Sequence, residues 1–132
     1  MRMTLPLCTW TLVALSLPPA IAAMANPAKM EKTAIGRVLA NKDGMTLYTF
    51  GKDGRDRSEC TGSCAVNWPP FLAPADATSS GDWTLVTRQN GEKQWAYKGK
   101  PLYTFAKDHK PGQANGNGLL HGAWEAARPG KA

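Results

Sequence analysis

The chain contains one ten-residue segment twice, and this repeat limits the folds that are open to it. Residues 44–53 read Gly-Met-Thr-Leu-Tyr-Thr-Phe-Gly-Lys-Asp and residues 99–108 read Gly-Lys-Pro-Leu-Tyr-Thr-Phe-Ala-Lys-Asp, so seven of ten positions are identical at an offset of 55. Trp68 and Trp124 follow the two aspartates by 15 and 16 residues. Because each half is too small to bury its own aromatic side chains, we expect two related halves packed face to face about an approximate twofold axis.

Both halves carry the pattern of β-hairpins. Residues 38–40 and 45–50 flank a turn that contains Asp-Gly, and residues 83–87 and 93–97 flank a turn that contains Asn-Gly. These dipeptides favour tight turns because both residues tolerate positive φ. Lys98 and Gly99 then turn the chain into a further strand over 101–105, which completes a three-stranded meander.

The remaining segments carry little secondary-structure signal. A single helical turn is expected within 61–67, before prolines stop it, and residues 72–82 and 110–122 are expected to be loops. The predicted fold class is therefore mostly β, with two tandem β-meander repeat units, about 35–80 and 81–132, packed as one small domain. Their interface is expected to bury the large apolar side chains, namely Leu47, Phe50, Leu102, Phe105 and the tryptophans.

The first 25 residues have the pattern of a cleavable signal peptide. Arg2 is their only charge, an apolar run follows, and small residues at Ala23 and Ala25 precede the expected cleavage site. Pro18 and Pro19 interrupt the apolar run before it reaches the ~20 residues of a membrane-spanning helix. The sequence thus predicts a periplasmic or secreted protein without a membrane span, and residues 26–34 are expected to be a flexible lead-in.

Two cysteines remain after the signal peptide is removed. Cys60 and Cys64 are four residues apart, and on a helical turn such residues lie about 6 Å apart on one side. Export favours a structural disulfide between them. A redox-active pair and a metal site remain as alternatives, but His109 and His121 are distant in the sequence, so no metal or other cofactor is predicted.

The repeated motif places a tyrosine and an aspartate in each half. In a functional interpretation, the pairs Tyr48/Asp53 and Tyr103/Asp108 bind a cation or a polar ligand. In a structural interpretation, each carboxylate accepts backbone N–H groups of the loop that leaves the strand, while each tyrosine packs its ring and its hydroxyl finds a partner. The structural interpretation is preferred because an aspartate just after a strand is common in turns.

Charge and composition limit the classes of molecule that the protein is expected to bind. Removing residues 1–25 takes away one arginine and no acid, so 15 basic and 10 acidic residues remain, a formal charge of +5. For an exported protein this favours anionic envelope components over nucleic acid as partners. The tryptophans are expected in the core, with a ligand-stacking platform around Trp95 and Tyr97 as the alternative. No nucleophile or carboxylate pair suggests an enzyme.

The motif residues Tyr48, Phe50, Asp53, Tyr103, Phe105 and Asp108 give the chain a family resemblance. It resembles the predicted secreted-repeat lipoproteins with a Y-x-[FWY]-x-x-D motif, and the likeness includes Cys60-x3-Cys64-x3-Trp68 and covers roughly residues 36–128. The resemblance implies export and tandem repeats but no established activity. We therefore expect a non-catalytic envelope binding or structural module, and the alternative is a periplasmic redox or metal-handling protein that uses Cys60 and Cys64.

Overall fold

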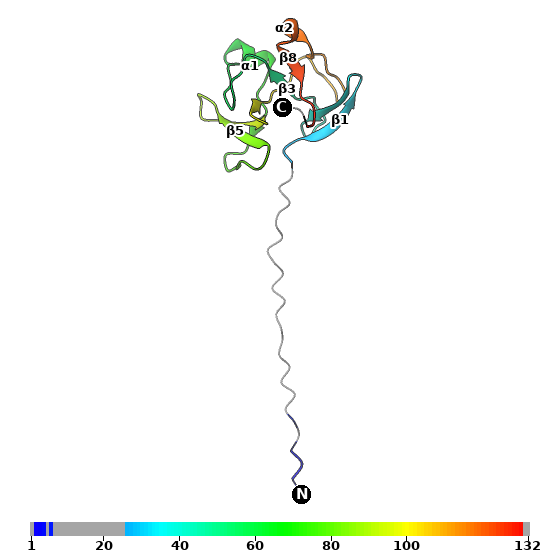
Figure 1. Ribbon diagram of the computed structural model, residues 1–132, viewed down its shortest axis with the longest axis vertical. Helices are drawn as coiled ribbons and strands as arrows, with labels where there is room; N and C mark the ends of the chain where they lie inside the picture. The colour runs from blue at the N-terminus through cyan, green and yellow to red at the C-terminus, as the bar shows by residue number, and fades with distance from the viewer. Residues whose placement is uncertain (1, 5, 7–25, 131–132) are drawn as a thin grey trace.

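The fold consists of antiparallel strands arranged around the two motif copies. The computed structural model describes residues 2–4, 6 and 26–130, so most of the predicted signal peptide lies outside the described residues. Figure 1 shows β1 and β5 on opposite sides of the molecule, with β3 and β8 between them. The elements are β1 (Lys29–Thr33), β2 (Gly36–Ala40), β3 (Tyr48–Phe50), α1 (Ser63–Asn67), β4 (Leu72–Ala73), β5 (Trp83–Thr87), β6 (Lys93–Tyr97), β7 (Lys100–Pro101), α2 (Leu119–Gly122) and β8 (Trp124–Ala126).

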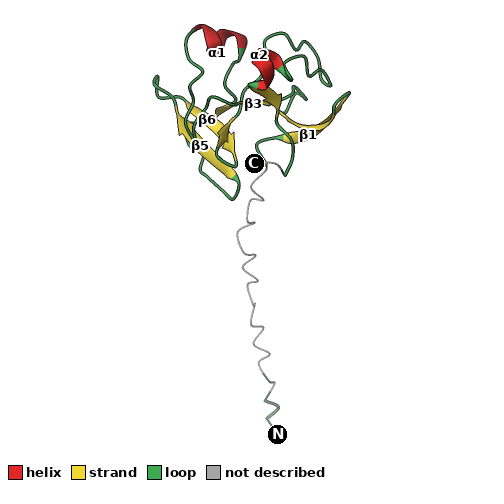
Figure 2. Cartoon of the chain, turned by 45° about the horizontal axis from the view of Figure 1, so that its top comes forward, coloured by secondary structure: helices red, strands yellow, loops and turns green. Residues whose placement is uncertain are grey.

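The predicted mostly β fold is confirmed, and one hairpin lies where the sequence places it. β5 pairs antiparallel with β6, with Trp83 opposite Tyr97. β7 adds to the other edge of β6, as the meander requires, but it is only two residues long. The helices are single turns, and Figure 2 shows α1 and α2 on the same side of the strands.

The lead-in expected over residues 26–34 is wrong for residues 29–33. These residues form β1, which pairs antiparallel with β2, and Thr33 Oγ1 closes the turn by donating to the carbonyl oxygen of Gly36 at 2.7 Å. Most side chains of β1 are exposed, so the strand lacks the apolar alternation that marks a half-buried strand. Backbone hydrogen bonds to β2 order this polar segment instead.

The first predicted hairpin is only partly formed. Its turn is present, since Gly44 N donates to Asn41 O at 2.9 Å, and Leu47 N still donates to Leu39 O at 2.9 Å. The chain then leaves β2, and β3 pairs with β8 of the second repeat. In the same way β4 of the first repeat pairs with β6 of the second. The repeats therefore exchange strands, where the sequence predicts two separate meanders.

Matching hydrogen bonds reveal an approximate twofold relation between the repeats. At its centre, Tyr48 N donates to Tyr103 O at 2.7 Å, and Tyr103 N donates to Tyr48 O at 3.0 Å. The flanking contacts also occur in pairs, each joining one repeat to the other: Ala127 N to Leu47 O with Phe71 N to Leu102 O, and Gly51 N to Ala123 O with Ala106 N to Asn67 O. Each half thus supplies the hydrogen-bonding partner that the other half lacks.

The core follows the same relation. Four rings form a continuous stack in which Trp68 and Trp124 lie parallel at the centre, 3.8 Å apart, while Phe50 covers Trp124 and Phe105 covers Trp68, each at 4.2 Å. Leu47 and Leu102 are fully buried in a second cluster. The predicted interface residues are thus largely buried, whereas three of them are only partly buried: Phe50, Trp83 and Trp95.

Candidate functional site

The two motif tyrosines meet at the centre of the molecule. Tyr48 and Tyr103 are both fully buried. The hydroxyl of Tyr48 donates to Asp108 Oδ2 at 2.5 Å, and the hydroxyl of Tyr103 donates to Asp53 Oδ2 at 2.6 Å. Each tyrosine thus contacts the aspartate of the other repeat, and not that of its own repeat as the functional interpretation of the motif has it. Because the segments that carry Tyr48 and Tyr103 run antiparallel and side by side at the twofold centre, each tyrosine ring reaches the loop of the other repeat.

Each motif carboxylate also holds the loop that follows it. Asp53 Oδ1 accepts the backbone N–H of Glu59 at 2.7 Å, and Asp108 Oδ1 accepts the backbone N–H of Asn115 at 2.9 Å. Both oxygens of each aspartate are thus engaged within the described part of the chain. Each carboxylate therefore joins its own loop to a tyrosine of the other repeat.

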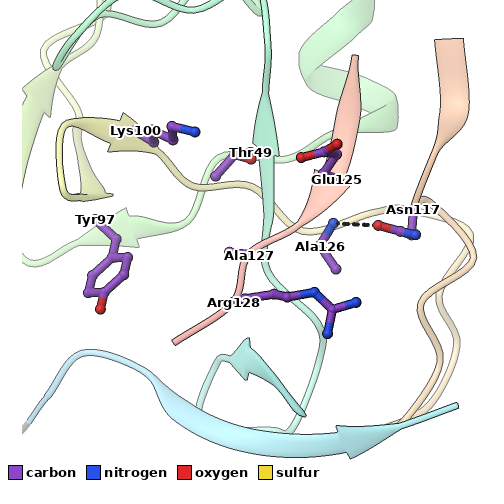
Figure 3. Close-up of a pocket in the computed structure, with 8 residues that line it drawn as sticks. All are labelled: Thr49, Tyr97, Lys100, Asn117, Glu125, Ala126, Ala127 and Arg128. Atoms are coloured by element: carbon purple, nitrogen blue, oxygen red, sulfur yellow. Dashed lines mark hydrogen bonds between the residues drawn. The ribbon is translucent and has the colours of Figure 1, made fainter. Parts of the chain in front are cut away.

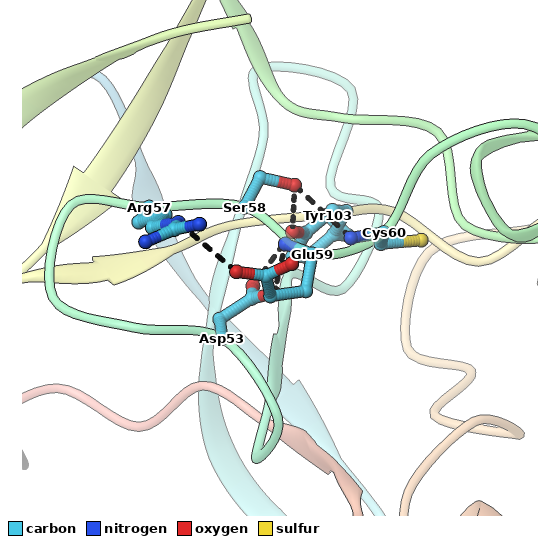
Figure 4. A network of polar contacts seen from close by, with 6 residues as sticks. All are labelled: Asp53, Arg57, Ser58, Glu59, Cys60 and Tyr103. Atoms are coloured by element: carbon cyan, nitrogen blue, oxygen red, sulfur yellow. Dashed lines mark hydrogen bonds and ion pairs between the residues drawn. The ribbon is translucent and has the colours of Figure 1, made fainter.

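Polar residues that the sequence did not single out complete the site in the first repeat. Figure 4 shows the Tyr103 hydroxyl between Asp53 and Ser58, whose Oγ lies 2.6 Å from it. Arg88 donates to Ser58 Oγ at 3.1 Å and to Gln94 Oε1 at 2.8 Å. The sequence gives a signal only for Gln94, which shares the buried face of β6 with Ala96.

The phenols of the two sites are held in their protonated state. Burial raises the pKa of Tyr48 and of Tyr103 well above the ordinary value of 10.0, and the neighbouring carboxylate raises it further. Burial also raises the pKa of Asp53, while the hydrogen bonds from Tyr103 and from Glu59 N oppose that rise. Both hydroxyls therefore act as hydrogen-bond donors over the neutral pH range.

The two cysteines form a disulfide at the start of α1. Their Cα atoms are 5.2 Å apart, Cys60 is fully buried, and Cys64 is partly exposed. The twofold relation matches this loop with residues 116–124, where Gly116 and Leu120 take the places of the cysteines. Only the loop of the first repeat therefore has a covalent link.

The other candidate ligands lie apart from these groups. His109 and His121 are exposed. Within residues 26–130 and the few described before them, no three His, Cys, Asp or Glu side chains come together in a way that fits a metal ion. Over the same residues, no helix has the length and apolar character needed to cross a membrane.

The fold and the motif site define a class of protein: a β-rich tandem repeat whose two copies are joined by reciprocal Tyr–Asp contacts. A family model described as "secreted repeat of unknown function" matches residues 29–71 and 84–128, one motif copy in each segment. The chain belongs to this family of secreted repeats. No curated protein and no solved structure gives a significant match.

Proposed function

We propose that the protein is an exported, non-catalytic binding or structural module of the cell envelope, released from its signal peptide into the periplasm or beyond. The observation that carries this proposal is the reciprocal hydrogen bonding of the motif. The phenols and carboxylates are the most reactive groups of the motif, and they form hydrogen bonds with one another and with backbone N–H groups. The motif therefore serves as a scaffold, and any ligand binds elsewhere on the surface.

The alternative function, redox or metal handling, would use the disulfide. Thiol–disulfide exchange needs a thiolate to reach one of the two sulfur atoms. Cys60 is fully buried, so attack is limited to the partly exposed Cys64. We expect the bridge to resist mild reductants. Mass spectrometry of the protein purified from the periplasm without reductant tests this: a stable loss of two hydrogens supports the proposal, and easy reduction or a retained metal contradicts it.

Substitution of the motif tyrosines tests the scaffold role. Tyr48→Phe leaves an oxygen of Asp108 without its donor in a buried site, so the free energy of unfolding should fall by about 1–3 kcal/mol in urea titrations. Tyr97→Phe is the control, because the hydroxyl of Tyr97 accepts only an exposed N–H of Gly130. If Tyr48→Phe leaves stability unchanged but removes a bound cation or ligand, the motif is a binding site and the proposal is wrong.

A further inference from the structure

A basic groove lies on the outer side of β3 and β8. It consists of two hollows, of about 260 and 440 Å³, that share Thr49, Lys100 and Glu125 as lining residues. Figure 3 shows Lys100 and Glu125 on either side of Thr49, with Arg128 beyond the end of β8. Arg55 and Lys98 line the second hollow. Because the two hollows share lining residues, they lie next to each other and together can hold an extended chain.

The groove carries an excess of positive charge. Within the described residues, the ion pairs are Lys29–Glu31 and Arg57–Glu59, so Arg55, Lys100 and Arg128 face the groove without a paired carboxylate. Of the two acidic residues that line it, Asp53 already uses both oxygens in hydrogen bonds. The other, Glu125, has a carboxylate with no hydrogen-bond partner among the described residues. The groove therefore attracts anions, while Glu125 adds an acceptor for hydroxyl groups.

One of the cations is held in place by the backbone. Asp56 N donates to Gly99 O at 2.7 Å, which fixes the loop that carries Arg55. The side chain of Arg55 lies directly over Gly99, where a Cβ atom would come within 2.9 Å of Arg55 Cγ. Gly99 also has a φ of +83°, which other residues rarely adopt. Because the loop of Arg55 is already ordered, binding of a ligand costs less conformational entropy.

The fold itself does not need these cations. The repeat offset matches Lys98 with Asp43 and Lys100 with Met45, and the same twofold relation matches Arg128 with Leu72. The first repeat thus builds the same arrangement of strands with acidic or apolar residues at these positions. At these three positions the positive charge is therefore present on only one of the two equivalent surfaces, which points to a role in recognition.

Aromatic rings continue the groove at one end. Tyr97 lines the first hollow, its ring centroid lies 5.0 Å from that of Trp83, and Trp83 lies 6.1 Å from Trp95. All three rings lie on one face of the β5–β6 hairpin, opposite Val86 and Ala96, and are partly exposed. Trp83 and Tyr97 also pack against the buried cluster around Leu47 and Leu102. Partly exposed aromatic rings stack on the apolar faces of sugars, and hydroxyl and carboxylate groups beside them bind sugar hydroxyls.

We propose that this basic groove binds an acidic glycan of the cell envelope, with its carboxylate or phosphate groups on Lys100, Arg128 and Arg55 and its sugar rings toward Tyr97. Glu125 discriminates against polymers that carry charge without sugar hydroxyls. This inference rests on the proposed function, because it names the ligand class of the binding module.

Binding of oligogalacturonate, a carboxylate-bearing glycan, to the mature chain tests the inference. Calorimetry and tryptophan fluorescence should detect binding that weakens as salt rises. The double variant Lys100→Gln/Arg128→Gln should lower the affinity about tenfold. Its matched control is Lys42→Gln/Lys107→Gln, which removes the same charge from exposed lysines outside the groove and should bind like the unmodified chain.

Three comparison ligands separate the sources of binding. A neutral oligosaccharide, polyglutamate and vesicles of anionic phospholipid should each bind clearly more weakly than oligogalacturonate. The inference is overturned if oligogalacturonate does not bind, if the control variant loses as much affinity as the groove variant, or if polyglutamate or the vesicles bind equally well. If the groove variant binds like the unmodified chain, the groove is not the binding site and this inference is overturned, whereas the proposed function as a binding module is unaffected. If the oligosaccharide is shortened, the protein is an enzyme and the proposed function itself fails.

Discussion

At the scale of single residues, a tyrosine hydroxyl in each repeat meets an aspartate of the other repeat. Tyr48 and Asp108 are 60 positions apart in the chain, and Tyr103 and Asp53 are 50 apart. Each contact joins a buried donor to a carboxylate that also fixes its own loop. One side chain thus couples the packing of the core to the conformation of a loop in the opposite half.

The raised pKa values of these phenols predict a loss of stability at alkaline pH. In the unfolded chain the phenols of Tyr48 and Tyr103 ionise near pH 10, whereas the folded state keeps them protonated there. The folded state then binds more protons, so the free energy of unfolding falls as pH rises above about 10, by up to about 1.4 kcal/mol per pH unit for each tyrosine. Below about pH 9 these groups contribute no pH dependence.

Urea titrations across this pH range, with Tyr48→Phe as the comparison, measure the effect. The variant lacks one of the two phenols, so its free energy of unfolding should fall less steeply with pH. The difference in slope should correspond to about one bound proton. The two proteins differ only in this hydroxyl, so all other contributions cancel in the difference. Equal slopes would show that the Tyr48 hydroxyl is not held protonated by the fold.

Gly116 is a second residue on which the core depends. It is buried, and a Cβ atom there would come within 2.6 Å of Trp68 Cη2 and 3.0 Å of Tyr48 Cε1. Gly116→Ala should therefore destabilise the protein by about 1–3 kcal/mol, because the indole has no room to move within the stack of rings. In Gly54→Ala, the control, the new Cβ meets only Arg57 at an ordinary 3.5 Å, so thermal unfolding should change little. A similar melting temperature for the two variants would contradict the packing described here.

At the scale of elements, the two loops that follow the motifs are equivalent in position but not in constraint. The loop before Trp68 is closed by the disulfide, and the loop before Trp124 places Leu120 and His121 in the left-handed region, with φ of 53° and 56°. Left-handed conformations are unfavourable for such residues. We expect amides of the second loop to exchange with solvent faster than those of the first.

Removing the disulfide tests its share of the stability. Closing a loop with a sequence separation of 4 stabilises a folded chain by about 2 kcal/mol in the chain-entropy model. Cys60→Ala/Cys64→Ala should lower the free energy of unfolding by about that amount and should speed hydrogen exchange in α1. If only the second loop responds, the link does not act locally and the expected role of the disulfide is wrong.

How much of each element the sequence predicts depends on how local its interactions are. The β5–β6 hairpin was predictable because its turn dipeptide and its alternating side chains are contiguous. The pairing of β3 with β8 joins residues from opposite ends of the domain, and nothing in either segment specifies the partner. β1 was not predicted because backbone hydrogen bonds to β2 and the Thr33 turn hold a segment without apolar alternation. Ser58 and Arg88 were not predicted because their contacts form only in the folded state.

At the scale of the whole molecule, the two repeats are mutually dependent. The central hydrogen bonds, the stacked rings and the Tyr–Asp contacts each take one member from each half. The repeat in the sequence was sufficient to predict two copies in one domain, but it did not reveal that they exchange strands. The exchange leaves a shared core and two equivalent outer surfaces, of which one has acquired the basic groove.

Separate expression of the two halves tests this mutual dependence most directly. Residues 26–80 and 81–132 meet in an exposed turn that is closed by hydrogen bonds between Ser80 and Trp83, so the cut leaves the contacts of the buried core intact. Each fragment alone should show no cooperative unfolding and no near-ultraviolet circular dichroism from stacked tryptophans, and mixing them in equal amounts should restore both signals. A fragment that unfolds cooperatively on its own would contradict the account.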